Sequence, residues 1–312
     1  MKRKVIQIAN STQLISLPRK WSLQFGIKKG DELEVEEKGS QIIVSTEKGV
    51  KNKNVVLDVT DMDRSSIIFY IRSAYRKGYD EIEIHYKRPM TTHLRKDERK
   101  KISSIIYEEV NHLIGVEILK QKEDMCVIKD ISNSSEKDFD IILRRIFLLL
   151  IEMGNDLLEG AKTKNDELLN TIEDRHDNIT KLVSYCLRLL NKKGYPDVTQ
   201  TSILFYIISN LENITDILKW GGRDMTYFKP KFTNDAIKVM DGVIDLIRKY
   251  YKIYYKFDTK GASELYELRS SLLTKIKNHK LFSGKELIIL NNLAHINEII
   301  VNLTETKMCM HL

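Results

Sequence analysis

The chain has 312 residues, of which 42% are hydrophobic and 30% are charged. This length suggests two or three domains, and the composition is that of globular proteins, which excludes a disordered or a fibrous chain. The 51 Lys and Arg residues exceed the 44 Asp and Glu residues by seven, so the surface favours an anionic partner, either a nucleic acid or a membrane surface.

The distribution of cysteines and apolar residues indicates a cytoplasmic protein without membrane insertion. Cys126, Cys186 and Cys309 stand far apart in the sequence, which supports neither a disulfide framework nor a thiolate zinc site. The longest strictly apolar run, 146–151, has six residues, whereas a bilayer-spanning helix needs about 20. The first ten residues also lack the apolar stretch of a signal peptide. We expect all three thiols to be reduced.

Residues 1–48 are predicted to form a small all-β domain with one short helix. Short strands are expected at 5–8 and 14–17, a helix from Pro18, and a hairpin made by 33–36 and 42–45 with its turn at 37–40. Residues 1–30 carry seven cations and no acid, whereas residues 31–37 carry five acids. The basic stretch could neutralise several phosphates, or it could be a solvated face.

The sequence pattern changes after the first segment, and the pattern of residues 54–130 predicts a compact α+β domain of order βαβαββ. The expected strands and helices are strand 55–59, helix 64–77, strand 81–86, helix 95–114 and strands 116–119 and 125–128. The basic residues of 95–101 are interpreted as a solvated face of the second helix.

Residues 138–312 show helical periodicity almost without interruption and predict an all-α bundle. The expected helices are 138–163, 165–192, 198–219, 233–257, 261–279 and 283–307. The Gly221 and Gly222 pair is taken as a break between two related three-helix units.

Two pairs of carboxylates in the bundle are candidates for a metal site. Glu173 and Asp177 are four residues apart, as are Glu212 and Asp216, so each pair lies on one helix face. The two helices should be antiparallel neighbours, which could bring four carboxylates together around a divalent or iron cation (Mg, Mn, Fe or Zn). The alternative is a solvated acidic face. His176 is either a core histidine or an additional ligand.

No motif in the sequence supports catalysis. A phosphate-binding loop, a nucleophile elbow and a zinc-protease motif are all missing from the sequence. We therefore expect that the protein is not an enzyme, and a metal-dependent phosphatase is the weakest alternative.

The amino-terminal segment resembles the SpoVT/AbrB swapped-hairpin family. The strand, the Leu17-Pro18 pair, the short helix, Gly26-Ile27, Lys29-Gly30-Asp31 and the hairpin follow one another in the order of that family. The resemblance implies an interlocked homodimer that binds double-stranded DNA. It places five basic residues on phosphates, Lys2, Arg3, Lys4, Arg19 and Lys20. The arginine that commonly precedes the second strand in that family is absent here.

The bundle resembles the PhoU family over roughly residues 138–306. The resemblance rests on the helix order, on Glu212 and Asp216 within a Leu-Glu-x-Ile-x-Asp motif, and on the preceding Glu173 and Asp177. Members of this family are regulators of phosphate uptake that hold metals with such carboxylates, so these four residues inherit the ligand role. The corresponding site of the second unit is expected to be lost.

The combined architecture resembles an archaeal group of phosphate-uptake regulators. It implies a phosphate-responsive regulator that binds DNA through the dimeric AbrB-like domain and senses phosphate status, or a partner, through the bundle. The alternative is an adaptor that does not bind DNA and negatively regulates a phosphate ABC transporter by docking on its cytoplasmic ATPase.

Overall fold

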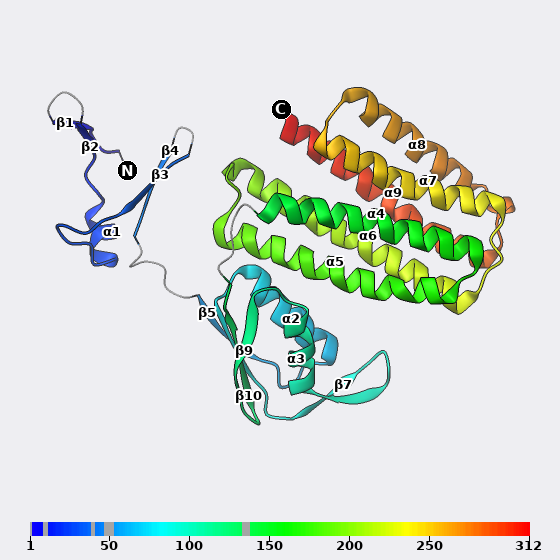
Figure 1. The fold of residues 1–312 in the computed structure, drawn as a ribbon, viewed down its shortest axis with the longest axis horizontal. Helices are drawn as coiled ribbons and strands as arrows, with labels where there is room; N and C mark the ends of the chain where they lie inside the picture. Colours follow the sequence, from blue (N-terminus) through cyan, green and yellow to red (C-terminus); the bar gives the residue numbers. More distant parts are fainter. Residues whose placement is uncertain (1, 9–11, 39–40, 47–52, 133–137) are drawn as a thin grey trace. The chain divides into compact units, whose positions relative to one another are not determined.

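The computed structural model describes residues 2–8, 12–38, 41–46, 53–132 and 138–312 (Figure 1). The chain divides into two compact units, 1–53 and 54–312. The tip of the predicted 37–40 turn and the predicted boundary at residue 48 lie outside the described residues.

The described residues of the first unit form two short antiparallel strand pairs and one short helix. Strands β1 (Ile6–Ile8) and β2 (Thr12–Leu14) pair with each other, and β3 (Glu34–Lys38) pairs with β4 (Gln41–Ser45). Helix α1 (Arg19–Gln24) follows Pro18, whose fixed φ suits a helix start. Gly26 adopts a φ of +61° directly after the helix, a conformation that glycine accepts at little cost.

The first unit has no apolar core of its own among its described side chains. None of them is buried, and several large apolar side chains are mostly exposed, including Leu23 at 71% and Ile42 at 68%. About 50 residues of short strands bury too little surface to stand alone. The described side chains of this unit therefore do not cover its apolar surface themselves.

The second unit begins with a four-stranded sheet covered on one face by two helices (Figure 1). The strands lie in the order β5-β6-β10-β9, with β5 and β6 parallel and the other pairs antiparallel. Helix α2 begins at the N-cap Asp63 and ends at Gly78, which has a φ of +92°. The bounds are β5 (Asn54–Asp58), α2 (Arg64–Lys77), β6 (Glu81–His85), α3 (Ile102–Asn111), β9 (Val116–Gln121) and β10 (Met125–Asp130).

The prediction of a helix over 95–114 is wrong at its start. A hairpin of β7 (Met90–His93) and β8 (Glu98–Lys101) occupies this region, and Asp97 in its turn has a φ of +49°. Residues 95–101 contain no apolar side chain, so they offer no stripe that could face the core. The helix begins only at Ile102, which is fully buried.

Within residues 138–312, the structure contains six long helices and two short 3-10 turns. The long helices are α4 (Asp138–Thr163), α5 (Asp166–Lys193), α6 (Thr201–Phe228), α7 (Asn234–Tyr255), α8 (Thr259–Lys277) and α9 (Gly284–His311). The 3-10 turns are Val198–Gln200 and His279–Leu281. All six helices contribute to one apolar core, as their 3.6-residue periodicity predicts.

Helix α6 is longer than predicted because it continues through the glycine pair. Gly221 and Gly222 are buried within it, and the helix ends at Phe228. A Cβ on Gly221 would lie 3.5 Å from Leu293, and one on Gly222 would lie 3.4 Å from Ile172. Both distances are ordinary contacts, so neighbouring side chains pack normally against α6 at these positions, and the glycines do not break the helix.

Among the described residues, α9 is the one helix with the length and apolar content to cross a membrane. Its most apolar window is 44% buried within the protein, where it contacts α6 and α7. Ile289, Leu293, Ile296 and Ile300 of this helix lie in the bundle core. A core helix of a bundle gives the same composition signal, so the signal is weak.

A buried guanidinium fixes the sheet domain to the bundle. Arg188 of α5 is 2% exposed and donates to the carbonyl oxygens of Tyr75 at 2.6 Å and Tyr79 at 2.8 Å. It also donates to Asp130 at 2.6 Å, as does Lys192 at 2.8 Å. Burial alone would raise the pKa of Asp130, but hydrogen bonds from Lys192, Ser132 and Arg188 hold it well below its ordinary value.

Candidate functional site

The five residues predicted to bind DNA are all exposed in the first unit. Lys2, Arg3 and Lys4 precede β1, and Arg19 and Lys20 open α1. The first turn of α1 contains no acidic residue, so the basic character predicted for this stretch is retained around the helix start. Their exposure leaves these five cations accessible to an anionic partner.

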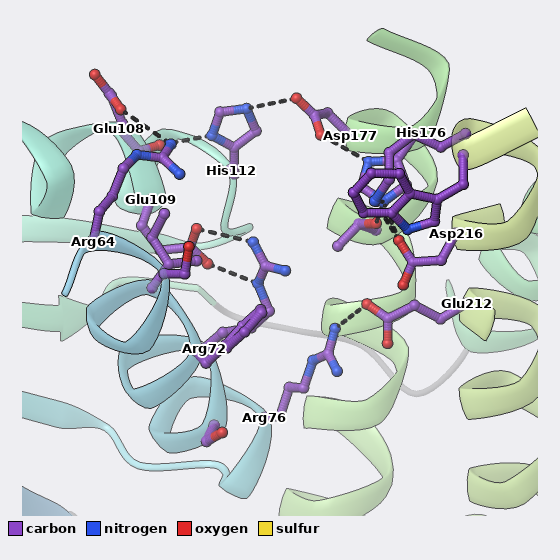
Figure 2. A pocket seen from close by; sticks show the side chains of 17 residues that line it. Arg64, Arg72, Arg76, Glu108, Glu109, His112, His176, Asp177, Glu212 and Asp216 are labelled. Carbon is purple, nitrogen blue, oxygen red and sulfur yellow. Dashed lines mark hydrogen bonds and ion pairs between the residues drawn. The ribbon is translucent and has the colours of Figure 1, made fainter. Parts of the chain in front are cut away.

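The second unit contains a cleft of about 620 Å³ between its sheet domain and its bundle (Figure 2). Helices α2 and α3 form one wall, and α5 and α6 form the other. Two ion pairs cross the cleft: Arg76 to Glu212 at 2.5 Å and His112 to Asp177 at 3.8 Å. The volume is in the range of small-molecule sites.

The wall made by α2 and α3 carries three arginines together with two glutamates, Glu108 and Glu109. Arg72 donates to both oxygens of Glu109, with Nε–Oε1 at 2.8 Å and Nη2–Oε2 at 3.0 Å. Glu109 is 3% exposed, so this forked pair has a fixed orientation. Arg76 donates to Glu212 and to the hydroxyl of Ser184. Arg64 lies 3.6 Å from Glu108.

The opposite wall carries three of the four carboxylates predicted as metal ligands, Asp177, Glu212 and Asp216. The fourth, Glu173, pairs with Arg223 instead and does not line the cleft. The Arg223 guanidinium accordingly lowers the pKa of Glu173. Each of the four carboxylates therefore faces a positively charged or hydrogen-bonding side chain of the protein itself.

His176 lies between two of these carboxylates. Its Nδ1 is 2.9 Å from an oxygen of Asp177, and its Nε2 is 2.9 Å from an oxygen of Asp216. Burial disfavours the imidazolium, but the hydrogen bonds to the two carboxylates raise the pKa of His176 above its ordinary value. Burial likewise disfavours the ionised form of Asp216, but His176 and Lys219 hold its pKa at about 2.

This arrangement does not assemble the predicted metal cluster around one point. Across the described parts of the chain, no group of three or more His, Cys, Asp or Glu residues is placed to hold a metal ion. A cation would have to displace Arg76, Arg223 and Lys219 from their carboxylates. Metal binding by Glu173, Asp177, Glu212 and Asp216 stays a prediction, and His176 lies beside these carboxylates and outside the apolar core.

Sequence reasoning missed the basic wall of the cleft. Arg72 and Arg76 are four residues apart and project from one face of α2, so the spacing signal was present in the sequence. Their partners Glu109 and Glu212 lie 37 and 136 residues further along the chain. Such pairings cannot be read from spacing within one helix.

Comparison with known proteins supports the interpretation of the first unit. Residues 6–52 match the family described as "Antidote-toxin recognition MazE, bacterial antitoxin". A search of curated proteins found no match. The matched domain indicates a DNA-binding or antitoxin-type regulator, and the same chain also contains a larger, mainly helical region.

Proposed function

We propose that the protein is a homodimeric, DNA-binding regulator. In this proposal Lys2, Arg3, Lys4, Arg19 and Lys20 contact the phosphates of double-stranded DNA. The observation that carries the proposal is the family match over residues 6–52 on a unit whose first 30 residues hold seven cations and no acid. Dimer symmetry doubles that charge, which increases the number of counterions released from DNA.

The lack of buried side chains in the described part of the first unit supports the dimer. Two copies that cover each other's apolar side chains would build the core that one copy does not have. Leu23, Val35 and Ile42, each more than 60% exposed, are the side chains expected to enter that core.

A salt titration of duplex-DNA binding tests this function. The logarithm of the binding constant should fall with the logarithm of salt concentration, with a slope of roughly −0.9 for each phosphate neutralised. Replacing Arg19 and Lys20 by Ala should flatten that slope by about two to four units, depending on whether both subunits contact DNA.

The matched control replaces two exposed lysines of the bundle, Lys238 and Lys260, whose side chains are 71% and 87% exposed. Loss of these two charges should leave the slope unchanged. A wild-type protein that does not bind its own upstream region at about 50 mM salt would contradict DNA binding and favour a protein partner.

The proposal extends to the bundle as the sensing part of the regulator. We infer that it reports phosphate status to the DNA-binding unit, through a bound cation or a partner such as the cytoplasmic ATPase of a phosphate transporter. Support for this extension comes from the PhoU-like sequence motifs alone. DNA affinity measured with and without inorganic phosphate, after dialysis against Mg²⁺, Mn²⁺, iron or Zn²⁺, should change if it holds.

An antitoxin-type role is the second candidate, since the description of the matched family names recognition of a toxin. In that case the first unit would bind another protein. Co-purification of a small partner encoded beside this chain, lost when residues 1–53 are removed, would favour the second candidate.

A further inference from the structure

We propose that the cleft between α2–α3 and α5–α6 binds a purine nucleotide, with its phosphate on the arginines of α2 and its base against Trp220 of α6. All residues that line this cleft belong to the second unit. Four properties of the cleft carry the proposal: its shape, the free donors of its basic wall, its exposed aromatic side chains and its balance of charge.

The shape of the cleft follows from how α2 is attached to α5. The carboxyl end of α2 is fixed to α5, where Arg188 binds the Tyr75 carbonyl and Asn191 binds the Arg76 carbonyl at 2.7 Å. Towards its amino end α2 diverges from the bundle, and the space of about 620 Å³ opens there. In Figure 2, Arg72 lies between the two ion pairs that cross this space, opposite Asp216 and Glu212. The contacts of Arg188 and Asn191 thus fix the carboxyl end of α2, and the cleft lies along the rest of this helix.

The basic wall has hydrogen-bond donors to spare. Arg72 uses Nε and Nη2 on Glu109, and Arg76 uses Nε and Nη2 on Ser184 and Glu212. Within the described residues, Nη1 of neither arginine has a hydrogen-bond partner. The two guanidinium groups lie one helical turn apart, and the hydroxyl of Ser73 also lines the space. Fixed guanidinium groups with free N–H donors suit the oxygens of a phosphate.

Two large aromatic side chains line the cleft and are exposed. Phe69 on the α2 side is 63% exposed, and Trp220 on the α6 side is 48% exposed. The guanidinium of Arg223 lies 4.6 Å and Nζ of Lys219 lies 5.5 Å from the centre of the Trp220 ring, and these contacts limit the ring's movement. An exposed, oriented indole at a concave site offers a stacking surface for a planar ring.

The balance of charge selects the kind of ligand. Four cationic side chains of Lys and Arg and five carboxylates line the cleft. The wall of α2 and α3 holds the three arginines with Glu108 and Glu109, and the opposite wall holds Lys219 with Asp177, Glu212 and Asp216. The carboxylates of the opposite wall repel any anion, so an inorganic anion, which offers them no compensating donor group, would gain little here. A purine nucleotide matches both walls, since its phosphate is anionic while the N–H groups of its base can donate to carboxylates.

The fluorescence of Trp220 allows nucleotide binding to be measured directly in the full-length chain. The chain contains two tryptophans, so a Trp21→Phe variant leaves Trp220 as the single indole. Its fluorescence should be quenched on titration with AMP, ATP, GMP or GTP, in Mg²⁺ and again in EDTA. Adenosine and inorganic phosphate, each tested alone, should bind much more weakly than AMP. Calorimetry of the wild-type protein should give the same order.

Variants on each wall test the two halves of the site. Trp220→Ala should weaken AMP binding about tenfold or more, the loss expected for one stacked base. The matched control, Tyr227→Ala, removes an 81% exposed aromatic of the same helix outside the cleft and should bind normally. Arg72→Gln combined with Glu109→Gln removes a cation together with its buried partner, and should weaken AMP more than adenosine.

Three results would overturn the proposal. The first is an absence of binding by any of the four nucleotides at millimolar concentration. The second is inorganic phosphate that binds as tightly as AMP and is indifferent to Trp220→Ala, which would define a simple anion site. The third is nucleotide binding abolished by Arg19→Ala with Lys20→Ala yet retained by Trp220→Ala, which would place the phosphates on the first unit.

Discussion

Arg188 is the residue on which the attachment of the sheet domain to the bundle most depends. Its guanidinium is buried and binds the carbonyls of Tyr75 and Tyr79 and the carboxylate of Asp130. Arg188→Met should lower the free energy of unfolding by about 3 kcal/mol, because it leaves a buried carboxylate with less compensation. Urea unfolding followed by circular dichroism measures this loss.

Arg269→Met provides the comparison for that measurement. Arg269 binds Glu298, whose side chain is 51% exposed, so this pair is expected to contribute less than about 1 kcal/mol. Equal losses in the two variants would mean that Arg188 does not anchor the domain. Arg188 was not identified as an anchor from the sequence, because an arginine within an apolar run gives no indication of which carbonyls lie opposite it.

Asp130 should make the stability of the second unit depend on acidity. Its folded pKa is depressed from an ordinary value of 3.8, so its ionised form stabilises the protein above that value. This contribution is lost as the pH falls through the folded pKa. Asp130→Asn should therefore destabilise the protein at pH 7, and the difference from wild type should shrink as the pH falls below about 4. A difference that stays constant from pH 7 to pH 3 would contradict this.

At the scale of elements, the continuity of α6 can be tested with alanine. Gly221 has ordinary contact distances around a new Cβ, the nearest being 3.5 Å from Leu293. Gly221→Ala should raise the stability by up to about 1 kcal/mol, since alanine favours a helix interior over glycine. If the helix were broken at this point, the substitution would have no such benefit. Thermal unfolding decides between the two.

Gly78 provides a control, because a Gly→Ala substitution there should lower the stability instead of raising it. It has a φ of +92°, and a Cβ there would lie 2.6 Å from Cγ of Lys192. Gly78→Ala should destabilise the protein by at least 1 to 2 kcal/mol, roughly the cost of a left-handed conformation in a residue with a side chain. A neutral effect at this position would contradict the helix end described for α2.

The sequence predicts elements well where apolar residues repeat along one helix, and poorly where glycine or charge dominates. The starts and ends of α4 and α5 lie within a residue or so of their predictions, because their apolar stripes are long and their ends are marked. The β7–β8 hairpin was missed because a charged run is compatible with a helix face or a strand. The break expected at Gly221 was wrong because the buried face of α6 continues beyond the glycine pair to Met225.

At the scale of the whole molecule, removal of residues 1–53 should separate two properties. The chain from Asn54 onward has its own cores and should keep its helical circular dichroism. It should elute as a monomer and lose salt-dependent DNA binding, because the cations and the uncovered apolar surface of the first unit are gone. Light scattering coupled to gel filtration gives the mass. A dimer that survives the deletion would place the subunit contact in the bundle.

The cleft illustrates what a single sequence does not reveal at this scale. The four predicted carboxylates lie on the expected helices α5 and α6, and helical spacing was sufficient to place each pair on one face. The arginines opposite three of them come from a different domain, about 100 or more residues earlier. Their approach depends on tertiary contacts such as those of Arg188.

The absence of buried side chains in the described part of the first unit has a consequence for how such a protein behaves in a cell. If that unit folds only on a second copy, its folded population obeys mass action and rises with the number of molecules present. At low abundance the first unit, with its basic stretch, would remain unfolded while the second unit of the same chain is folded. The amount of protein would then itself set a threshold for occupying DNA, before any ligand acts.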